Sequence, residues 1–213
     1  MFILTLYYSP GTASMVVHLA LLELDVPHEL RLIDIDAKAQ KSPDYLRLNP
    51  NGVVPTLIID GAPVYECAAL LLLLGERHAD KRMAPQPGEA KRNTYLQWVL
   101  HLANTLQPAF RQWFYPADFG PADQGDAMRA FAQTRIEATW DRLDSHLAAQ
   151  GPYMLGENFS MLDVAIAPLL WRLDYYGIDL SKNAAPLLKY AERIFSRPAY
   201  IEALTPSEKV MRK

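Results

Sequence analysis

The chain has 213 residues, of which 50% are hydrophobic and 21% are charged, and its formal net charge is -3 at pH 7. Such a composition excludes a disordered chain, and the length allows one large domain or two small ones. The weak negative charge offers no broad basic surface for phosphate backbones, so nucleic acid is not expected as a ligand.

Two further classes of protein are excluded by local features. The single cysteine, Cys67, excludes an internal disulfide, and the first eight residues lack the basic and apolar regions of a signal peptide, so we expect a cytoplasmic protein. The longest apolar run covers residues 67–74 and is far short of the roughly 20 residues that cross a bilayer. We therefore expect no membrane-spanning segment.

The first part of the chain predicts a small α/β domain. Residues 2–8 are rich in β-forming side chains and end at a Ser-Pro-Gly turn, which predicts a buried strand. Residues 12–25 carry apolar side chains at helical spacing and predict a helix. A second strand over 29–35, a hairpin with an Asp-Gly turn over 56–65 and a helix over 65–78 complete the pattern.

The second part of the chain predicts helices alone. Two prolines and a glycine within 81–88 indicate a linker, which divides the chain into domains 1–80 and 89–213. Pro108 should kink the first of the helices because proline lacks a backbone donor. Apolar residues at three-to-four spacing predict helices over 89–115, 124–150, 161–175 and 185–195.

The third of these helices has a well-specified start. Ser160 stands at the N-cap with the carboxylate of Asp163 three residues on, and Phe159 and Val164 are spaced as an apolar staple. A buried acidic residue such as Asp163 could also be catalytic. We expect the capping role because the spacing already explains the residue.

Three short segments could carry chemistry. In the first, Pro55 joins a turn to a strand, which favours a cis peptide bond and leaves the N–H and C=O of Val54 for an extended, peptide-like ligand. Taken alone, this segment is better explained as a plain tight turn. In the second, Glu66 and Cys67 open a helix whose unpaired N–H groups suit a ligand carboxylate, while Glu66 suits an ammonium group. In the third, residues 7–14, hydroxyl groups at a helix mouth can favour a thiolate over a thiol.

Together, these segments resemble the cytosolic glutathione transferase family. The likeness covers nearly the whole chain, through YYSPGTAS, NPNGVVPTL, YEC and FSMLDVAIAP in that order. It implies a thioredoxin-like N-terminal domain that binds glutathione as co-substrate and an α-helical glutathione transferase C-terminal domain that completes a pocket for a hydrophobic electrophile. It also implies a homodimer and no metal.

The resemblance assigns the glutathione contacts residue by residue. Val54 before Pro55 matches the clamp on the cysteinyl part, and Glu66 with Cys67 matches the acidic-then-serine pair at the γ-glutamyl end. Cys67 replaces the serine, which keeps the N–H but weakens the side-chain hydrogen bond. Lys38 resembles the lysine that meets the glycyl carboxylate in bacterial beta-class members, and a solvated surface lysine is the alternative.

Further contacts are expected on the first long helix. His101 and Asn104 lie where beta-class members carry polar residues that touch glutathione, although such a stripe also fits a core or a dimer interface. The apolar surface for an electrophile is expected from Phe110, Trp113, Phe114 and Tyr115, which could equally pack in the core.

The position that activates the thiol departs from the family pattern. The reactive cysteine of the beta class falls on Ala13, which excludes mixed-disulfide chemistry there. Thr12 is the first candidate for the activating hydroxyl, Ser14 the second and Tyr7 the third, and each has a helix cap or core packing as its alternative role. Cys67 is a candidate nucleophile, but packing is favoured because no histidine is near it in sequence.

The sequence therefore predicts a glutathione transferase that conjugates or reduces electrophiles. The main alternative is a non-catalytic member of the same fold, because residues 167–213 also resemble stringent starvation protein A, a partner of bacterial RNA polymerase. The Pro-His-Pro element of that family is not visible in the linker region, where residues 78–88 read HADKRMAPQPG. A glutathione-dependent isomerase or reductase is a third possibility, since tertiary packing sets the electrophile pocket.

Overall fold

The computed structural model describes residues 3–170 and 185–205. Its contacts divide the chain into two compact units. The first unit comprises the described residues up to Gln86 together with those from Ile194 onward, and the second unit is Pro87–Arg193. The domain limits expected from the linker at 81–88 stay a prediction.

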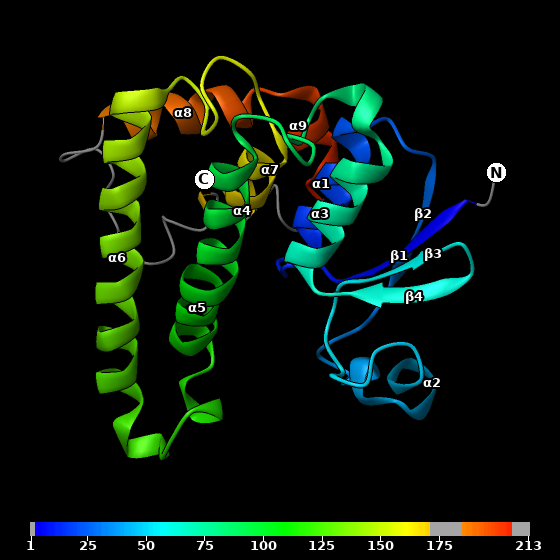
Figure 1. The fold of residues 1–213 in the computed structure, drawn as a ribbon. Helices are drawn as coiled ribbons and strands as arrows, with labels where there is room; N and C mark the ends of the chain where they lie inside the picture. The colour runs from blue at the N-terminus through cyan, green and yellow to red at the C-terminus, as the bar shows by residue number, and fades with distance from the viewer. Residues whose placement is uncertain (1–2, 171–184, 206–213) are drawn as a thin grey trace. The chain divides into compact units, whose positions relative to one another are not determined.

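A four-stranded sheet in the order β2-β1-β3-β4 forms the centre of the first unit (Figure 1). Its strands are β1 (Leu4–Tyr8), β2 (His28–Leu32), β3 (Thr56–Ile59) and β4 (Ala62–Tyr65). β1 and β2 are parallel, whereas β3 is antiparallel to both β1 and β4. A helix therefore connects the parallel pair and a tight hairpin connects the last two strands, as the sequence predicts.

Helices α1 (Ser14–Glu23) and α3 (Cys67–Arg77) pack against each other and against the sheet (Figure 1). α1 contacts β1 and α3 contacts β4, and Leu6, Leu57 and several leucines of both helices are fully buried. The unit also contains the short helices α2 (Pro43–Leu46) and α9 (Pro198–Ala203), and α9 packs on α1. The predicted α/β fold with a thioredoxin-like order of elements is confirmed.

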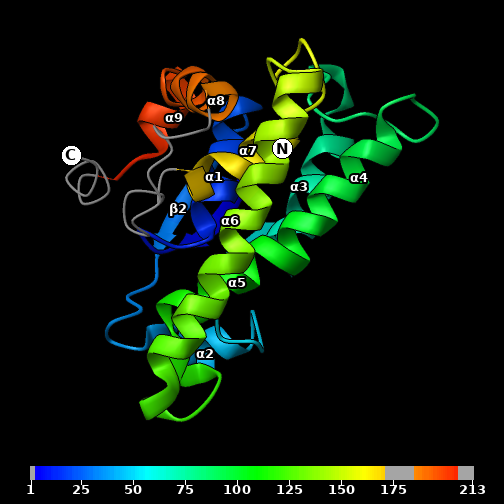
Figure 2. The ribbon, with the colours of Figure 1, turned by 90° about the vertical axis from the view of Figure 1, so that its left-hand side faces the viewer.

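The second unit is helical in its described part. Helices α5 and α6 lie side by side in both views, and α4 packs on α7 (Figure 1, Figure 2). The helices are α4 (Arg92–His101), α5 (Gln107–Phe114), α6 (Gly125–Gln150), α7 (Met161–Leu170) and α8 (Ala185–Phe195). The last two residues of α8, Ile194 and Phe195, belong to the first unit. Residues 171–175, predicted to extend the third helix, lie outside the described residues.

The first predicted helix of this unit is interrupted just before Pro108. Residues Leu102–Leu106 form a π-helical turn between α4 and α5. Proline has no N–H for the carbonyl four residues earlier, that of Asn104, so the regular hydrogen-bond pattern cannot pass this point. The predicted effect of Pro108 thus takes the form of a π turn.

None of the helices in the described residues is long and apolar enough to cross a bilayer.

Candidate functional site

The three predicted chemical segments of the first unit leave the sheet at the same end. Tyr7 pairs with Thr56, and Thr56 pairs with Tyr65, so one row crosses β1, β3 and β4. The loop with Thr12 follows β1, the turn with Val54 precedes β3, and Glu66 follows β4. Residues far apart in the sequence therefore converge because the register of three strands places them there.

The loop between β1 and α1 holds a triangle of oxygen atoms. Thr12 Oγ1 lies 2.7 Å from the Ser9 carbonyl oxygen and 2.7 Å from Ser14 Oγ. Ser14 Oγ lies 3.1 Å from the same carbonyl and accepts a hydrogen bond from the Ser9 N–H at 3.2 Å. The two hydroxyls thus lock the loop, and α1 begins at Ser14 rather than at Thr12.

Exposure separates the three candidate hydroxyls. Ser14 is buried, with 1% of its surface exposed, whereas Thr12 and Tyr7 are half-buried. The Tyr7 ring packs edge to face on the ring of Tyr45, with centroids 5.9 Å apart. Thr12 is therefore the hydroxyl of the triangle that a ligand can reach. Its role in activating a thiol stays a prediction.

The turn before β3 presents the main chain of Val54. The predicted cis bond between Val54 and Pro55 is confirmed. Within the described part of the chain, no hydrogen bond to the Val54 N–H or C=O is formed. Val54 has 9% of its surface exposed, and a main-chain donor and acceptor without a partner next to a strand suit an extended ligand.

Tyr45, which sequence reasoning missed, and Asn49, the first residue of the Asn-Pro-Asn-Gly run, hold this turn in place. Tyr45 donates its hydroxyl hydrogen to the Val53 carbonyl at 2.8 Å and lies 2.9 Å from Thr56 Oγ1. Asn49, which is fully buried, donates to the same carbonyl at 2.8 Å. Burial raises the pKa of the Tyr45 hydroxyl, so the group stays protonated and can donate. The Asn-Pro-Asn-Gly run signalled a turn, but nothing in the sequence signalled Tyr45.

The start of α3 has an unusual backbone. Glu66 is exposed and has a φ of 76°, in the left-handed region that favours glycine. Its side chain caps no N–H of the helix. Strained backbone of this kind is concentrated at functional sites, and the exposed carboxylate suits a cation.

Cys67 is the first residue of α3 and is half-buried. Its thiol donates to the Ala13 carbonyl at 3.4 Å, which ties the start of α3 to the mouth of α1. This contact supports the packing role that the sequence favours. The glutathione contacts of Glu66 and Cys67 stay predictions.

Lys38 precedes a short 3₁₀ turn and is exposed, with a left-handed φ of 57°. The nearby Lys41 donates to the Asn51 carbonyl at 3.3 Å and so is tied to the turn before β3. The proposed contact of Lys38 with a carboxylate stays a prediction.

In the second unit, His101 is held by two neighbours. Its Nε2 lies 3.4 Å from the Arg142 guanidinium and its Nδ1 lies 3.4 Å from Thr105 Oγ1. A guanidinium only donates, so Nε2 accepts and the proton of the neutral ring is on Nδ1. Burial, together with the positive charge of Arg142, lowers the pKa of His101. Asn104 is exposed in the π turn, and the ligand contacts of both residues stay predictions.

The four aromatic residues expected to face an electrophile differ in exposure. Phe110 is buried and its ring centroid lies 6.3 Å from that of Trp140, so it packs in the core of the unit. Trp113 and Phe114 are half-buried with their rings edge to face, and Tyr115 is exposed. The contact of the last three with an electrophile stays a prediction.

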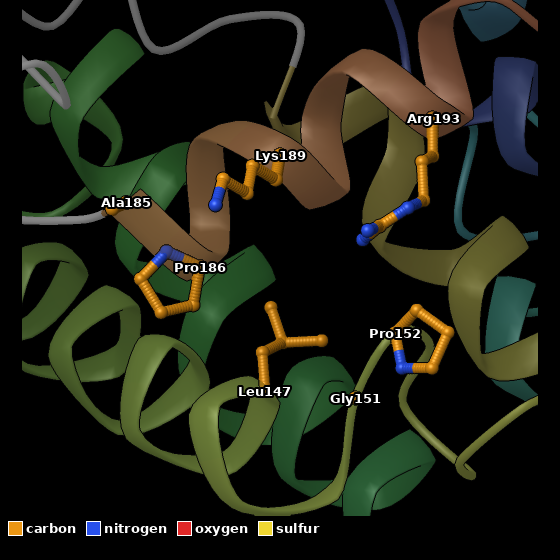
Figure 3. Close-up of a pocket in the computed structure, with 7 residues that line it drawn as sticks. All are labelled: Leu147, Gly151, Pro152, Ala185, Pro186, Lys189 and Arg193. Atoms are coloured by element: carbon orange, nitrogen blue, oxygen red, sulfur yellow. The ribbon is translucent and has the colours of Figure 1, made fainter.

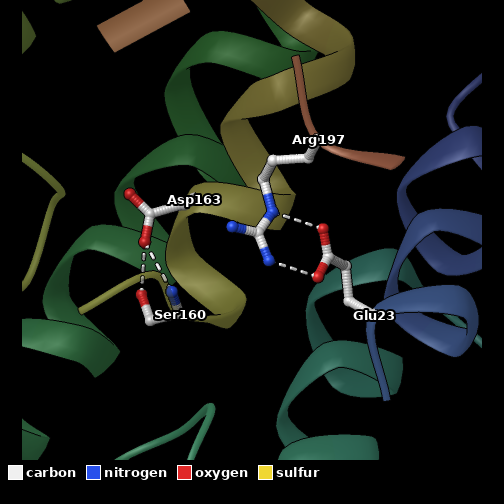
Figure 4. A network of polar contacts seen from close by, with 4 residues as sticks. All are labelled: Glu23, Ser160, Asp163 and Arg197. Atoms are coloured by element: carbon white, nitrogen blue, oxygen red, sulfur yellow. Dashed lines mark hydrogen bonds and ion pairs between the residues drawn. The ribbon is translucent and has the colours of Figure 1, made fainter. Parts of the chain in front are cut away.

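The capping role of Asp163 is confirmed (Figure 4). Its carboxylate is fully buried and accepts from the Ser160 N–H and hydroxyl, both at 2.7 Å. It also accepts from the Met154 N–H at 2.9 Å and the Tyr190 hydroxyl at 2.8 Å. Burial raises the pKa of Asp163, and these hydrogen bonds oppose that effect. A carboxylate so enclosed cannot contact a substrate.

A cavity of about 330 Å³ also lies in the second unit (Figure 3). Two of its lining side chains, Lys189 and Arg193, are cationic and the others are apolar. None of the predicted site residues lines this cavity. The lining residues are Leu147, Gly151, Pro152, Ala185, Pro186, Lys189 and Arg193. The residues that line it carry neither a hydroxyl nor a carboxyl side chain.

Among the residues that the structure describes, no group of three or more His, Cys, Asp or Glu side chains could hold a metal ion.

Both units match one family of proteins. Residues 6–82 match the glutathione S-transferase N-terminal domain, and residues 107–193 match its C-terminal domain. A solved sphingomonad glutathione S-transferase complexed with glutathione is 30% identical, with a TM-score of 0.83 over 97% of this chain and 99% of that one.

Two curated relatives have different names. Glutathione S-transferase GST-4.5 of Xanthomonas campestris is 29% identical over 184 residues, which is 84% of this chain and 87% of the relative. A stringent starvation protein A homolog of Pasteurella multocida is 28% identical over 190 residues, 88% of this chain and 83% of the relative. The resemblances on which the sequence predictions rest are confirmed.

Proposed function

The chain belongs to the glutathione S-transferase family, and on that premise we propose that its first unit binds glutathione and ionises the thiol for attack on a hydrophobic electrophile. The observation that carries the proposal is the row of Tyr7, Thr56 and Tyr65, from which three polar segments leave one end of the sheet. Neighbouring strands lie about 4.8 Å apart, so these segments begin within about 10 Å of one another, which is the length of an extended tripeptide.

The binding roles follow from the donors and acceptors of each segment. The main chain of Val54 pairs with the cysteinyl part of glutathione as an added strand would. The N–H of Cys67, at the start of an 11-residue helix, receives the γ-glutamyl carboxylate, and Glu66 receives the ammonium group. Lys38 meets the glycyl carboxylate.

The chemical step depends on the sulfur. Thr12 donates its hydroxyl hydrogen to the sulfur, which favours the thiolate, and the thiol proton leaves to water. A hydrogen bond to a charged group contributes about 1.5–3 kcal/mol, which lowers a thiol pKa by one to two units. The thiolate then attacks an electrophilic carbon, a C–S bond forms, and the leaving group departs with its bonding electrons. The residues that contact the electrophile stay predictions, as does the homodimer.

Calorimetry with glutathione and conjugation of 1-chloro-2,4-dinitrobenzene test this proposal. We expect Thr12→Val, which keeps the shape of the side chain, to bind glutathione but to lose roughly 10- to 100-fold in kcat/KM. Glu66→Gln should weaken binding, whereas Glu29→Gln, an exposed carboxylate on the edge strand, should change neither quantity. A wild-type protein that does not bind glutathione would refute the proposal.

A second candidate function is supported by the relative named stringent starvation protein A homolog. On this alternative the chain acts by binding RNA polymerase, and glutathione chemistry is not needed. Two observations together would favour this alternative. The protein would bind glutathione but turn over none of a panel of electrophiles, and it would retain RNA polymerase subunits equally well with and without Thr12→Val. A glutathione-dependent isomerase or reductase would instead show turnover that depends on Thr12.

A further inference from the structure

The oxygen triangle at the mouth of α1 has fewer protons than contacts. The Ser9 carbonyl only accepts, while Thr12 and Ser14 carry one hydroxyl proton each, so two protons serve three contacts. The contacts measure 2.7 Å between Thr12 and the carbonyl, 2.7 Å between the two hydroxyls, and 3.1 Å between Ser14 and the carbonyl. Which contact lacks a proton decides what each hydroxyl can do.

The two short contacts must both carry a proton. A distance of 2.7 Å is the usual length of an O–H···O hydrogen bond, and two oxygens so close without a proton repel each other. The proton between Thr12 and the carbonyl comes from Thr12, since a carbonyl has none. Ser14 must therefore donate to Thr12. In the loop as it stands, Ser14 donates to Thr12 and Thr12 donates to the Ser9 carbonyl.

This order commits the Thr12 proton before any ligand arrives. For Thr12 to donate to a sulfur, its hydroxyl must turn away from the Ser9 carbonyl, and Ser9 is buried with 5% of its surface exposed. A buried carbonyl that loses its donor without a replacement is costly. Ser14 is the replacement, because its hydroxyl already lies 3.1 Å from that carbonyl.

We propose that Ser14 is a positioning residue that releases the proton of Thr12: it donates to Thr12 while Thr12 donates to the Ser9 carbonyl, and it donates to that carbonyl itself once Thr12 turns to the glutathione sulfur. This role rests on the proposed function. Ser14 cannot contact the ligand itself, because only 1% of its surface is exposed, whereas Thr12 is half-buried. No covalent bond of either hydroxyl breaks, and the thiol proton leaves to water.

A double-mutant cycle on the thiol pKa of bound glutathione tests this role. The ultraviolet absorbance of the thiolate against pH gives that pKa for the wild type, Thr12→Val, Ser14→Ala and the double variant. We expect Ser14→Ala to raise the pKa by about one unit and Thr12→Val by at least as much. Because Ser14 acts through Thr12, the double variant should match Thr12→Val alone.

The outcomes distinguish this role from a structural one and from the proposed function. Ser14→Ala with an unchanged thiol pKa, or a double variant whose two shifts add, overturns the role of Ser14 and leaves the proposed function standing. A wild-type protein without bound glutathione removes the proposed function and this role with it. If Ser14→Ala does not fold, Ser14→Cys replaces it, because the thiol keeps a weak donor in the same place. Ser14→Cys should raise the thiol pKa of bound glutathione by less than Thr12→Val does. Added to Thr12→Val, it should cause no further change in that pKa.

Discussion

Replacement of the buried Asp163 by alanine tests the capping network of the second unit. The carboxylate accepts four hydrogen bonds, two from the main-chain N–H groups of Met154 and Ser160 and two from the hydroxyls of Ser160 and Tyr190. Alanine leaves these four donors without an acceptor at a site with no solvent access. The helix α7 also loses half of its capping box.

The expected cost follows from the two main-chain donors. Each buried donor left without a partner costs about 1–3 kcal/mol, and the N–H of Ser160 is also the capping contact of the helix. We expect Asp163→Ala to lower the free energy of unfolding of the second unit by about 2–6 kcal/mol. The midpoint of thermal unfolding should fall by about 10 °C or more.

Tryptophan fluorescence during unfolding in urea measures this loss for the second unit. The four tryptophans of the chain are Trp98, Trp113, Trp140 and Trp171, and all lie within Pro87–Arg193. The matched control is Tyr190→Phe, which removes one donor and leaves the carboxylate with three, and it should cost about 1 kcal/mol. An Asp163→Ala protein that unfolds within about 1 kcal/mol of the wild type would refute the reasoning.

The pH dependence of the free energy of unfolding gives a second test of Asp163, for which the direction of the change can be predicted. Burial raises the pKa of Asp163, so the folded state holds this proton more tightly than the unfolded state does. The corresponding stability is fully present below about pH 4 and is lost as the pH rises through the folded pKa. Asp163→Asn should lack this decline. A variant with the same slope as the wild type over this range would show that another group causes it.

Three further predictions concern both units. Arg197 and Glu23 form a bidentate ion pair at 2.5 and 2.6 Å, and 7% of the Glu23 side chain is exposed (Figure 4). Arg197→Ala leaves this carboxylate buried without its partner, so it should destabilise the first unit by about 3 kcal/mol. Denaturation followed by far-ultraviolet circular dichroism measures the loss. Cys67→Ser should lower the Kd for glutathione about fivefold in calorimetry, because a hydroxyl at this position donates a stronger hydrogen bond to the γ-glutamyl carboxylate than a thiol does. Arg142→Ala should raise the pKa of His101 in an NMR titration, because one of the two causes that lower it is removed and burial remains.

Each of these has a control or a contrary outcome. Arg47→Ala breaks an ion pair whose side chains are 71% and 87% exposed, and it should change stability by less than about 0.5 kcal/mol. Equal losses for the two arginine variants would contradict the role of burial. Weaker glutathione binding by the serine variant, or an unmoved histidine pKa, would contradict the other two.

Local chemistry in the sequence determined most elements of the fold. The Ser-Pro-Gly turn after β1, the Asp-Gly hairpin between β3 and β4 and the capping box at Asp163 act over a few residues, so spacing alone reveals them. The cis bond at Pro55 was also expected from its place between a turn and a strand. The helical pattern around Pro108 indicated a break, but its form as a π turn depends on how the backbone satisfies its carbonyls.

The candidate site was determined only in part by the sequence. Residues 7–14, Val54 and Glu66 were recognised as separate segments, and the strand register alone showed that they share one end of the sheet. The resemblance already ranked Thr12 before Ser14, but the burial of Ser14, which leaves Thr12 as the more accessible hydroxyl, is encoded by no local pattern. Tyr45 reaches Thr56 across 11 positions, and Arg197 reaches Glu23 across 174. Such contacts arise from the packing of the whole chain, so tertiary structure decides them.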